Sequence, residues 1–271
     1  MTVDTKPRLV RVAVFECLEL ADNIAQARGQ FNDVFATWLH RASLSYNEER
    51  PLSEQVQIET TAYRVIEGQY PPSLDGIDAI IVSGSTASAY DQDPWITRLA
   101  EYLRDVYTHN QRVRLFGGCF GHQLMVQTLL RDRGGFVEKS PEGWEIGVRQ
   151  VALNPKFKAH FPVLQDVSEV SCQFLHADHA VLDEARMAAD GWVRVGASPL
   201  CGVQGVYKPG KVLTFQGHPE FDGFLNEQGV RNLEKSGVLN GDEVKAALDL
   251  IHRDDDAILH GEVVIDFIVR A

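Results

Sequence analysis

One cysteine of this chain is flanked by glycines in a pattern suited to a nucleophile. In the run Phe-Gly-Gly-Cys-Phe-Gly-His-Gln, Gly117 and Gly121 lie two residues before and after Cys119. Residues 112–116 predict a short apolar strand and residues 121–130 a helix, so Cys119 falls on a sharp turn that needs small neighbours and a positive φ. The dipole and free N–H groups at the start of that helix favour a thiolate. Taken alone, the run also fits a buried structural cysteine beside a glycine turn.

A second run supplies groups that would activate this sulfur. Residues 216–220 read Gln-Gly-His-Pro-Glu and follow the end of a predicted strand. His218 is therefore expected at the carboxyl edge of a parallel sheet, where ligands collect in α/β proteins. Glu220 can accept the imidazole N–H and fix its tautomer. A cysteine, a histidine and an orienting carboxylate are the groups needed to open an amide through a covalent thioester.

The elements that must position these groups alternate between strand and helix. Near-continuous apolar runs predict buried strands over 9–15 and 77–82, and 56–58 is a short strand candidate. Apolar residues at helical spacing predict helices over 24–39 and 95–106, each with one face on the sheet. These apolar stripes are interpreted as core.

The second half of the chain is richer in strands. Further strands are predicted over 148–153, 167–174, 192–197, 203–207 and 212–216. From residue 221 onward the chain is mostly helical and polar, and the acidic run at 254–256 is expected to be a solvated helix end. We therefore predict an α/β fold with one open, mostly parallel sheet, helices on both faces and a β-rich second half.

Composition favours a cytoplasmic enzyme over a nucleic-acid-binding or membrane protein. The 271 residues include 26 Lys and Arg against 38 Asp and Glu, a net charge of −12, which is unfavourable for binding a polyanion. We expect no membrane span and no signal peptide, because no apolar run approaches the necessary length. The four cysteines form no CxxC pair, so neither a zinc site nor a disulfide framework is predicted.

On these motifs the chain resembles the class I glutamine amidotransferases of the Cys-His-Glu type. The resemblance runs from about Val10 to Phe221 and is strongest at 117–123 and 216–220. Ile-Ile-Val-Ser-Gly-Ser at residue 80 resembles the family's strand and oxyanion loop. Gly-Trp-Glu-Ile-Gly at residue 143 and Leu-His-Ala-Asp-His at residue 175 resemble its stand-alone, GMP-synthase-like branch, which includes the plant γ-glutamyl peptidases.

The resemblance implies a flavodoxin-like single domain over 1–271, with its core at about 9–221 and a helical C-terminal extension at 222–271. It implies a catalytic triad of Cys119, His218 and Glu220, acting on glutamine or a γ-glutamyl conjugate without a cofactor.

The oxyanion loop departs from the family pattern. The family often has Gly-Gly-Pro-Gly, whereas residues 83–88 read Ser-Gly-Ser-Thr-Ala-Ser. Backbone donors survive any substitution except proline, so the backbone of Gly84 or Ser85, together with the N–H of Phe120, can still hold an oxyanion. The changed side chains affect what lies beyond the scissile bond.

Four further residues are predicted to bind substrate. Gln123 lies about one helical turn past Cys119, and in the resembled family the matching glutamine contacts the substrate; a capping or core amide is the alternative. Trp144 and Glu145 line the pocket or belong to an edge strand. The resemblance makes the segment of His176 a pocket wall.

Two other interpretations near the site are less favoured. His176, Asp178 and His179 could suggest a metal cluster, but no third ligand has suitable spacing, so no metal site is predicted. The side chain of His122 is expected to point away from the site.

Three functions remain open at this point. The first is a stand-alone hydrolase of γ-glutamyl peptides or metabolites, and the second is a glutaminase subunit that supplies ammonia to a separate synthetase. The third is a binding protein without turnover, against which the intact triad argues. The roughly fifty residues after Glu220 are fewer than the usual 100 or more of a synthetase domain, which favours the hydrolase.

Overall fold

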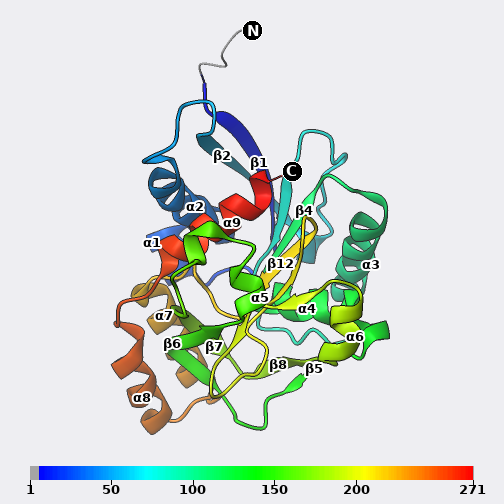
Figure 1. Cartoon of the computed structure of the whole chain (residues 1–271). Coiled ribbons are helices and arrows are strands. Elements are labelled where there is room, and N and C mark those ends of the chain that lie inside the picture. Colours follow the sequence, from blue (N-terminus) through cyan, green and yellow to red (C-terminus); the bar gives the residue numbers. More distant parts are fainter. Residues whose placement is uncertain (1–5, 271) are drawn as a thin grey trace, which may run out of the picture.

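A seven-stranded sheet forms the centre of the molecule in the computed structural model, which describes residues 6–270 (Figure 1). Its strand order is β2-β1-β3-β4-β12-β11-β9. The five parallel strands are β2 (Val56–Arg64), β1 (Arg8–Glu16), β3 (Ala79–Val82), β4 (Arg114–Gly118) and β12 (Val212–Phe215). The strands β11 (Val206–Lys208) and β9 (Val193–Arg194) add an antiparallel edge.

Helices cover both faces of this sheet, because alternate side chains of each strand point to opposite sides. On one face lie α1 (Asp22–Arg28), α2 (Phe31–Asn47) and α9 (Ala257–Val269); on the other lie α3 (Pro94–His109) and α4 (Phe120–Leu129). In β3, Ile81 belongs to the first core and Ile80 to the second. The predicted open, mostly parallel sheet with helices on both faces is confirmed.

The second half contributes two small antiparallel sheets as well. One pairs β5 (Phe136–Lys139) with β8 (Asp178–Val181), and the other contains β10 (Gly196–Ala197), β6 (Glu145–Leu153) and β7 (Glu169–His176). The remaining helices are α5 (Pro155–Lys158), α6 (Glu184–Ala189), α7 (Gly223–Lys235) and α8 (Gly241–Ile251), with 3₁₀ turns η1 (Val65–Glu67), η2 (Arg131–Arg133) and η3 (Pro162–Leu164). A β-rich second half is confirmed, but its strands do not all join one sheet.

Three sequence-based boundaries were wrong for identifiable reasons. The predicted strand over 192–197 is split between two sheets at Val195, whose N–H donates to Gly205 while its carbonyl accepts from Asn154. The predicted helix over 24–39 breaks at Gly29, which has φ +78°. Strand β2 extends well past residue 58, because an edge strand that alternates between burial and exposure lacks a continuous apolar run.

The acidic run before α9 is not a solvated helix end. Asp256 accepts a hydrogen bond from the backbone N–H of Ser171 at 2.6 Å, and Asp255 accepts one from Ala257 at 3.1 Å. Both aspartates are half-buried, and only Asp254 is exposed. The run therefore joins the start of α9 to β7.

The C-terminal helix α9 packs into the main core. Trp38 of α2 donates its indole N–H to the carbonyl of Ala257 at 2.8 Å. At Gly261 the two helices approach so closely that a Cβ would lie 2.3 Å from the Cβ of Ala42. Within residues 6–270, none of the helices has the length and apolar character needed to cross a membrane.

Candidate active site

Cys119 occupies a strained turn between β4 and α4. Its backbone has φ +47° and ψ −106°, and it is the single non-glycine residue with positive φ among residues 6–270. The predicted positive φ is confirmed. Such a conformation is costly for an L-residue and persists where the surroundings enforce it, as at nucleophile elbows.

The flanking glycines are required by close backbone contacts. A Cβ on Gly117 would lie 2.6 Å from the carbonyl carbon of Gly121, and a Cβ on Gly121 would lie 2.4 Å from the carbonyl oxygen of Val82. Real Cβ atoms do not approach other atoms so closely. The first turn of α4 is thereby pressed onto the ends of β3 and β4, with Cys119 at the head of the helix.

His218 and Glu220 form a buried pair at the carboxyl end of β12. The Nδ1 atom of His218 lies 2.8 Å from Oε1 of Glu220, and their side chains are 5% and 0% exposed. The backbone N–H of His218 donates to Gln173 of β7 at 2.8 Å, and the ring of Phe221 stacks on the imidazole at 4.1 Å. The ring of His218 is thus held in one plane and one orientation.

The sheet brings this pair to the sulfur. Strands β4 and β12 are parallel neighbours, and the N–H of Cys119 continues their ladder by donating to Phe215 at 2.9 Å. Burial alone would lower the pKa of His218, but the charges of Cys119 and Glu220 and its hydrogen bonds to them raise that pKa to about 10. Because Nδ1 faces Glu220, Nε2 is the ring atom available for the hydrogen bond with Cys119.

The loop after β3 lies against the imidazole. A Cβ on Gly84 would be 2.8 Å from Cε1 of His218. The side chains of Ser83 and Ser85 fasten this loop to the end of β1: Ser83 Oγ accepts from the N–H of Cys17, and Ser85 Oγ donates to its carbonyl, both at 2.9 Å. With its side chains engaged there, the loop has its backbone available near the site.

Three of the predicted substrate-binding residues make buried polar contacts, and the fourth packs among apolar side chains. Gln123 is 3% exposed and donates to the carbonyl of Asp178 at 2.9 Å and to Gln216 at 3.2 Å. Glu145 and His176 face each other, with Oε2 of the carboxylate 3.0 Å from Nε2 of the imidazole. Trp144 packs against the apolar cluster formed with α7 and α8.

The residues weighed as a metal cluster face different partners. His176 pairs with Glu145, the carboxylate of Asp178 accepts from Ser88 and Tyr90, and His179 lies 3.6 Å from Glu138. Within residues 6–270, no group of three or more His, Cys, Asp or Glu side chains is placed to hold a metal ion.

His122 points into the core, as predicted, where Nδ1 meets Thr214 at 2.7 Å. Burial, together with the nearby charge of His176, lowers its pKa to about 3.

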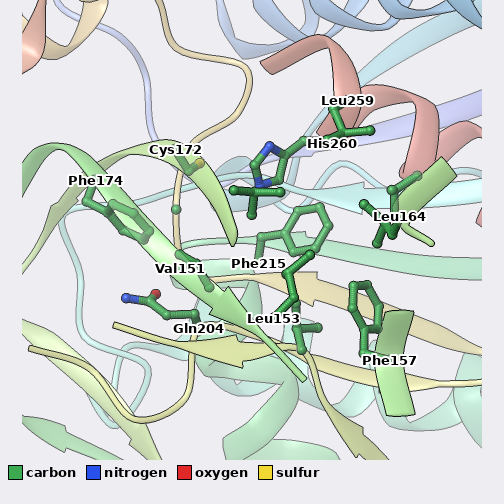
Figure 2. Close-up of a pocket in the computed structure, with 14 residues that line it drawn as sticks. Val151, Leu153, Phe157, Leu164, Cys172, Phe174, Gln204, Phe215, Leu259 and His260 are labelled. Carbon is green, nitrogen blue, oxygen red and sulfur yellow. The ribbon is translucent and has the colours of Figure 1, made fainter. Parts of the chain in front are cut away.

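The other cysteines are buried in unreactive surroundings. Burial raises the pKa of Cys17, that of Cys172 and, to about 12, that of Cys201. Cys172 borders a small apolar cavity of about 20 Å³, together with Phe215, Gly217 and His260 (Figure 2). A cavity of that size has room for about one water molecule and is too small for a substrate.

Sequence reasoning missed the residues that surround Glu145. Ser198 donates to Oε1 of Glu145 at 2.6 Å, and Gln204 donates to Oε2 at 2.8 Å. Burial alone would raise the pKa of Glu145, but its hydrogen bonds to His176, Ser198 and Gln204 and the charge of His176 lower it. Gln216 lies within the recognised His218 motif, whereas no local signal marked Ser198 or Gln204.

Comparison with known proteins agrees with this architecture. The model of the family "Glutamine amidotransferase class-I" matches residues 32–236. A putative glutamine amidotransferase-like protein of Schizosaccharomyces pombe is 30% identical over 229 residues, which cover 83% of this chain and 85% of that protein. Gamma-glutamyl peptidase 2 of Arabidopsis thaliana is 24% identical over 248 residues, covering 90% and 89%.

A solved structure shares the fold. The crystal structure of a glutamine amidotransferase from Thermotoga maritima superposes with a TM-score of 0.63 at 17% identity and covers 96% of this chain and 99% of its own. The segment matched by the family includes both the Cys119 turn and the His218 loop. The chain belongs to the class I glutamine amidotransferase family.

Proposed function

We propose that this protein is a hydrolase of γ-glutamyl amide bonds, with Cys119 as nucleophile, His218 as proton-transfer group and Glu220 as its orienting carboxylate. The observation that supports this most directly is the strained Cys119 at the head of α4, beside a buried His218–Glu220 pair. Relatives named gamma-glutamyl peptidases support the substrate class.

The proposed reaction has two halves. The Cys119 thiolate attacks the γ-carbonyl carbon, a C–S bond forms, and the carbonyl oxygen becomes an oxyanion. The tetrahedral intermediate then collapses, the C–N bond breaks, and the His218 imidazolium protonates the leaving amine. In the second half His218 takes a proton from water, the water attacks the thioester, and glutamate leaves as the sulfur is released.

Backbone groups are proposed to hold the oxyanion. Phe120 is the first residue of α4, so its N–H has no intrahelical acceptor. The backbone of the loop at Gly84 and Ser85 lies against His218, since Gly84 closely approaches its ring. Donors from two different loops would then converge on the oxygen that becomes charged.

For the substrate pocket we propose that Gln123 contacts the glutamyl group. We propose that Trp144, Glu145 and His176 build the wall around it. Neither a cofactor nor a synthetase partner is needed for this chemistry, and a free catalytic thiol suits a reducing compartment such as the cytoplasm.

The test is turnover of γ-glutamyl dipeptides and of glutamine by the isolated chain. Cys119→Ala and His218→Ala should each lower kcat by about 10³-fold or more, because both groups take part in bond making. Glu220→Ala should leave measurable turnover, because an orienting group supplies only part of the rate enhancement. Cys201→Ala is the matched control and should retain kcat.

Two results would contradict the proposal. Full activity in Cys119→Ala would exclude the thioester route. An isolated chain that is inert toward every γ-glutamyl amide, but hydrolyses glutamine once a synthetase chain is added, would replace the hydrolase by an ammonia-supplying subunit.

A further inference from the structure

A chain of buried hydrogen bonds connects the first turn of α4 to strands β6 and β7. It runs from Gln123 through the carbonyl of Asp178 and the ring of His176 to Glu145, and on to Gln204. Each of the four residues whose side chains take part is no more than 5% exposed: Gln123, His176, Glu145 and Gln204.

Glu145 is the negative charge at the centre of this network. Its two oxygens accept from three side chains: Ser198 at 2.6 Å, Gln204 at 2.8 Å and His176 at 3.0 Å. The Glu145 carboxylate is deeply buried, and both of its oxygens are engaged by protein side chains. Direct contact with substrate is therefore not its main role. Its position is instead suited to controlling the groups that surround it.

His176 transmits the effect of this charge. Its Nε2 faces the Glu145 carboxylate, and its Nδ1 lies 2.9 Å from the carbonyl oxygen of Asp178. A carboxylate and a carbonyl can only accept hydrogen bonds, so both contacts are hydrogen bonds when both ring nitrogens carry a proton. A doubly protonated ring buried at this depth needs a counter-charge, which Glu145 supplies.

The Asp178 carbonyl then fixes the amide of Gln123. That carbonyl accepts from both His176 and Gln123, which occupies its two lone pairs. The Nε2 atom of Gln123 also donates to the side-chain oxygen of Gln216 at 3.2 Å. Two oxygens therefore hold the amide nitrogen, and the amide oxygen Oε1 is left without a donor among the described residues.

The network also reaches both candidate catalytic loops. Gln123 lies one turn beyond the nucleophile, and its backbone N–H donates to the carbonyl of Cys119 at 3.0 Å. Gln216 precedes His218 by two residues, and its N–H donates to the carbonyl of Gln204 at 3.0 Å. A disturbance at Glu145 would thus reach the pocket through Gln123.

We infer that Glu145 is a positioning residue: through His176 it holds the Gln123 amide with its oxygen free to accept a hydrogen bond from the substrate's α-ammonium group. The inference rests on the proposed function, because it assigns one determinant of its substrate specificity. It predicts that Glu145 controls the preference for a γ-glutamyl group over the glutaryl group, which differs only by lacking the α-amine.

The experiment measures binding, so that it does not depend on turnover. In the Cys119→Ala background, the affinities for a γ-glutamyl dipeptide and for its glutaryl analogue are determined by calorimetry. We expect a preference of about 100-fold for the γ-glutamyl compound, since without the α-amine the Gln123 oxygen has no hydrogen-bond donor. Adding Glu145→Gln should reduce this preference to below about 10-fold, mainly through weaker binding of the γ-glutamyl compound.

The Glu145→Gln change keeps the shape of the side chain but removes the charge. A neutral His176 has one N–H and cannot donate to both neighbours, so the Asp178 carbonyl and Gln123 lose their fixed geometry. The matched control is Glu138→Gln, which removes the half-exposed carboxylate that lies 3.6 Å from His179 and should keep the full preference.

A second variant covers the case in which Glu145→Gln fails to fold. Ser198→Ala removes one donor to Glu145 and should lower the preference by about 3- to 10-fold. An unchanged preference in the folded variants would overturn the inference, as would failure of the parent protein to distinguish the two compounds. A wild type that binds γ-glutamyl compounds selectively but hydrolyses none would contradict the proposed function alone.

Discussion

At the scale of single residues, charge and backbone strain act together on one sulfur atom. Cys119 is held with positive φ at a helix N-terminus, and His218 has both Cys119 and Glu220 as charged neighbours. These neighbours outweigh the burial that would otherwise keep the imidazole neutral. With its pKa raised to about 10, the ring is an imidazolium at neutral pH, which is the form that the proposed mechanism needs to protonate a leaving amine.

The first prediction at this scale concerns alkylation of Cys119. An imidazolium stabilises an adjacent thiolate, so iodoacetamide should modify Cys119 at pH 7 about 10-fold or more faster in wild type than in His218→Ala. His218 has its pKa raised to about 10, so its charge is present at neutral pH and is lost as the pH rises through about 10. The two rates should therefore converge above that pH.

Peptide mapping by mass spectrometry measures these rates site by site. The internal controls are Cys17, Cys172 and Cys201, whose pKa values are raised by burial and which should stay unmodified in the native protein. Equal rates in wild type and His218→Ala across the whole pH range would show that the imidazole does not act on the sulfur.

At the scale of elements, three loops meet at the carboxyl edge of the central sheet. The elbow after β4 carries Cys119, the loop after β12 carries His218, and the loop after β3 carries Gly84. The β3 loop is tied to the end of β1 by two serine side chains and cannot retreat freely. Its distance from the imidazole is therefore set by packing between elements.

This arrangement predicts the effect of Gly84→Ala. The added methyl group would lie 2.8 Å from the His218 ring, so either the ring or the loop must shift. Displacement of a catalytic group by about 1 Å can cost about 10²-fold in rate, and kcat on a γ-glutamyl dipeptide should fall by up to about that factor.

The matched control is Gly202→Ala, where a Cβ meets nothing within 4 Å. This variant should retain wild-type kcat. Thermal unfolding of both variants separates a local displacement from a loss of folded protein. An unchanged kcat in folded Gly84→Ala would mean that the β3 loop can shift without displacing the His218 imidazole.

At the scale of the whole molecule, the two faces of the sheet are both covered and polar groups are buried between layers. His122 is fully buried on α4, and its pKa is lowered to about 3 by burial and by the charge of His176. In the unfolded chain a histidine titrates near pH 6.5. The native state must therefore keep this ring neutral at a pH where the unfolded chain protonates it.

The resulting prediction is a contribution of His122 to acid destabilisation. The pKa of His122 is lower in the folded protein than in the unfolded chain. Its contribution to the free energy of unfolding is therefore fully present above about pH 6.5 and is lost as the pH falls toward about 3. Relative to His122→Asn, the free energy of unfolding of wild type should fall by roughly 1.4 kcal/mol per pH unit in that window.

Urea unfolding at pH 7, 6 and 5 measures this difference. His40→Asn is the control, because His40 is exposed on α2 and its replacement should leave the pH dependence unchanged. Parallel pH dependences for wild type and His122→Asn would exclude a neutral, buried imidazole at this position.

The sequence by itself determined the strained turn at Cys119 and the general fold. The elbow is a local structure. It needs glycines at 117 and 121 and a strand followed by a helix, and all of these features lie within a short stretch of sequence. The central parallel strands were predictable for a similar reason: a strand buried on both faces is a continuous apolar run, as in β3. The His218–Glu220 pair is also local, since a single residue, Pro219, separates its members.

Only the tertiary structure decided which polar groups surround Gln123 and Glu145. Gln204 and Glu145 are 59 residues apart, and Gln123 and Gln216 are 93 apart, so no periodicity along the chain relates them. The same holds for the change of sheet at Val195 and for Asp256, whose partner Ser171 lies 85 residues away. Hydrogen bonds between distant segments depend on how sheets and helices pack, which local patterns of apolar and polar residues do not specify.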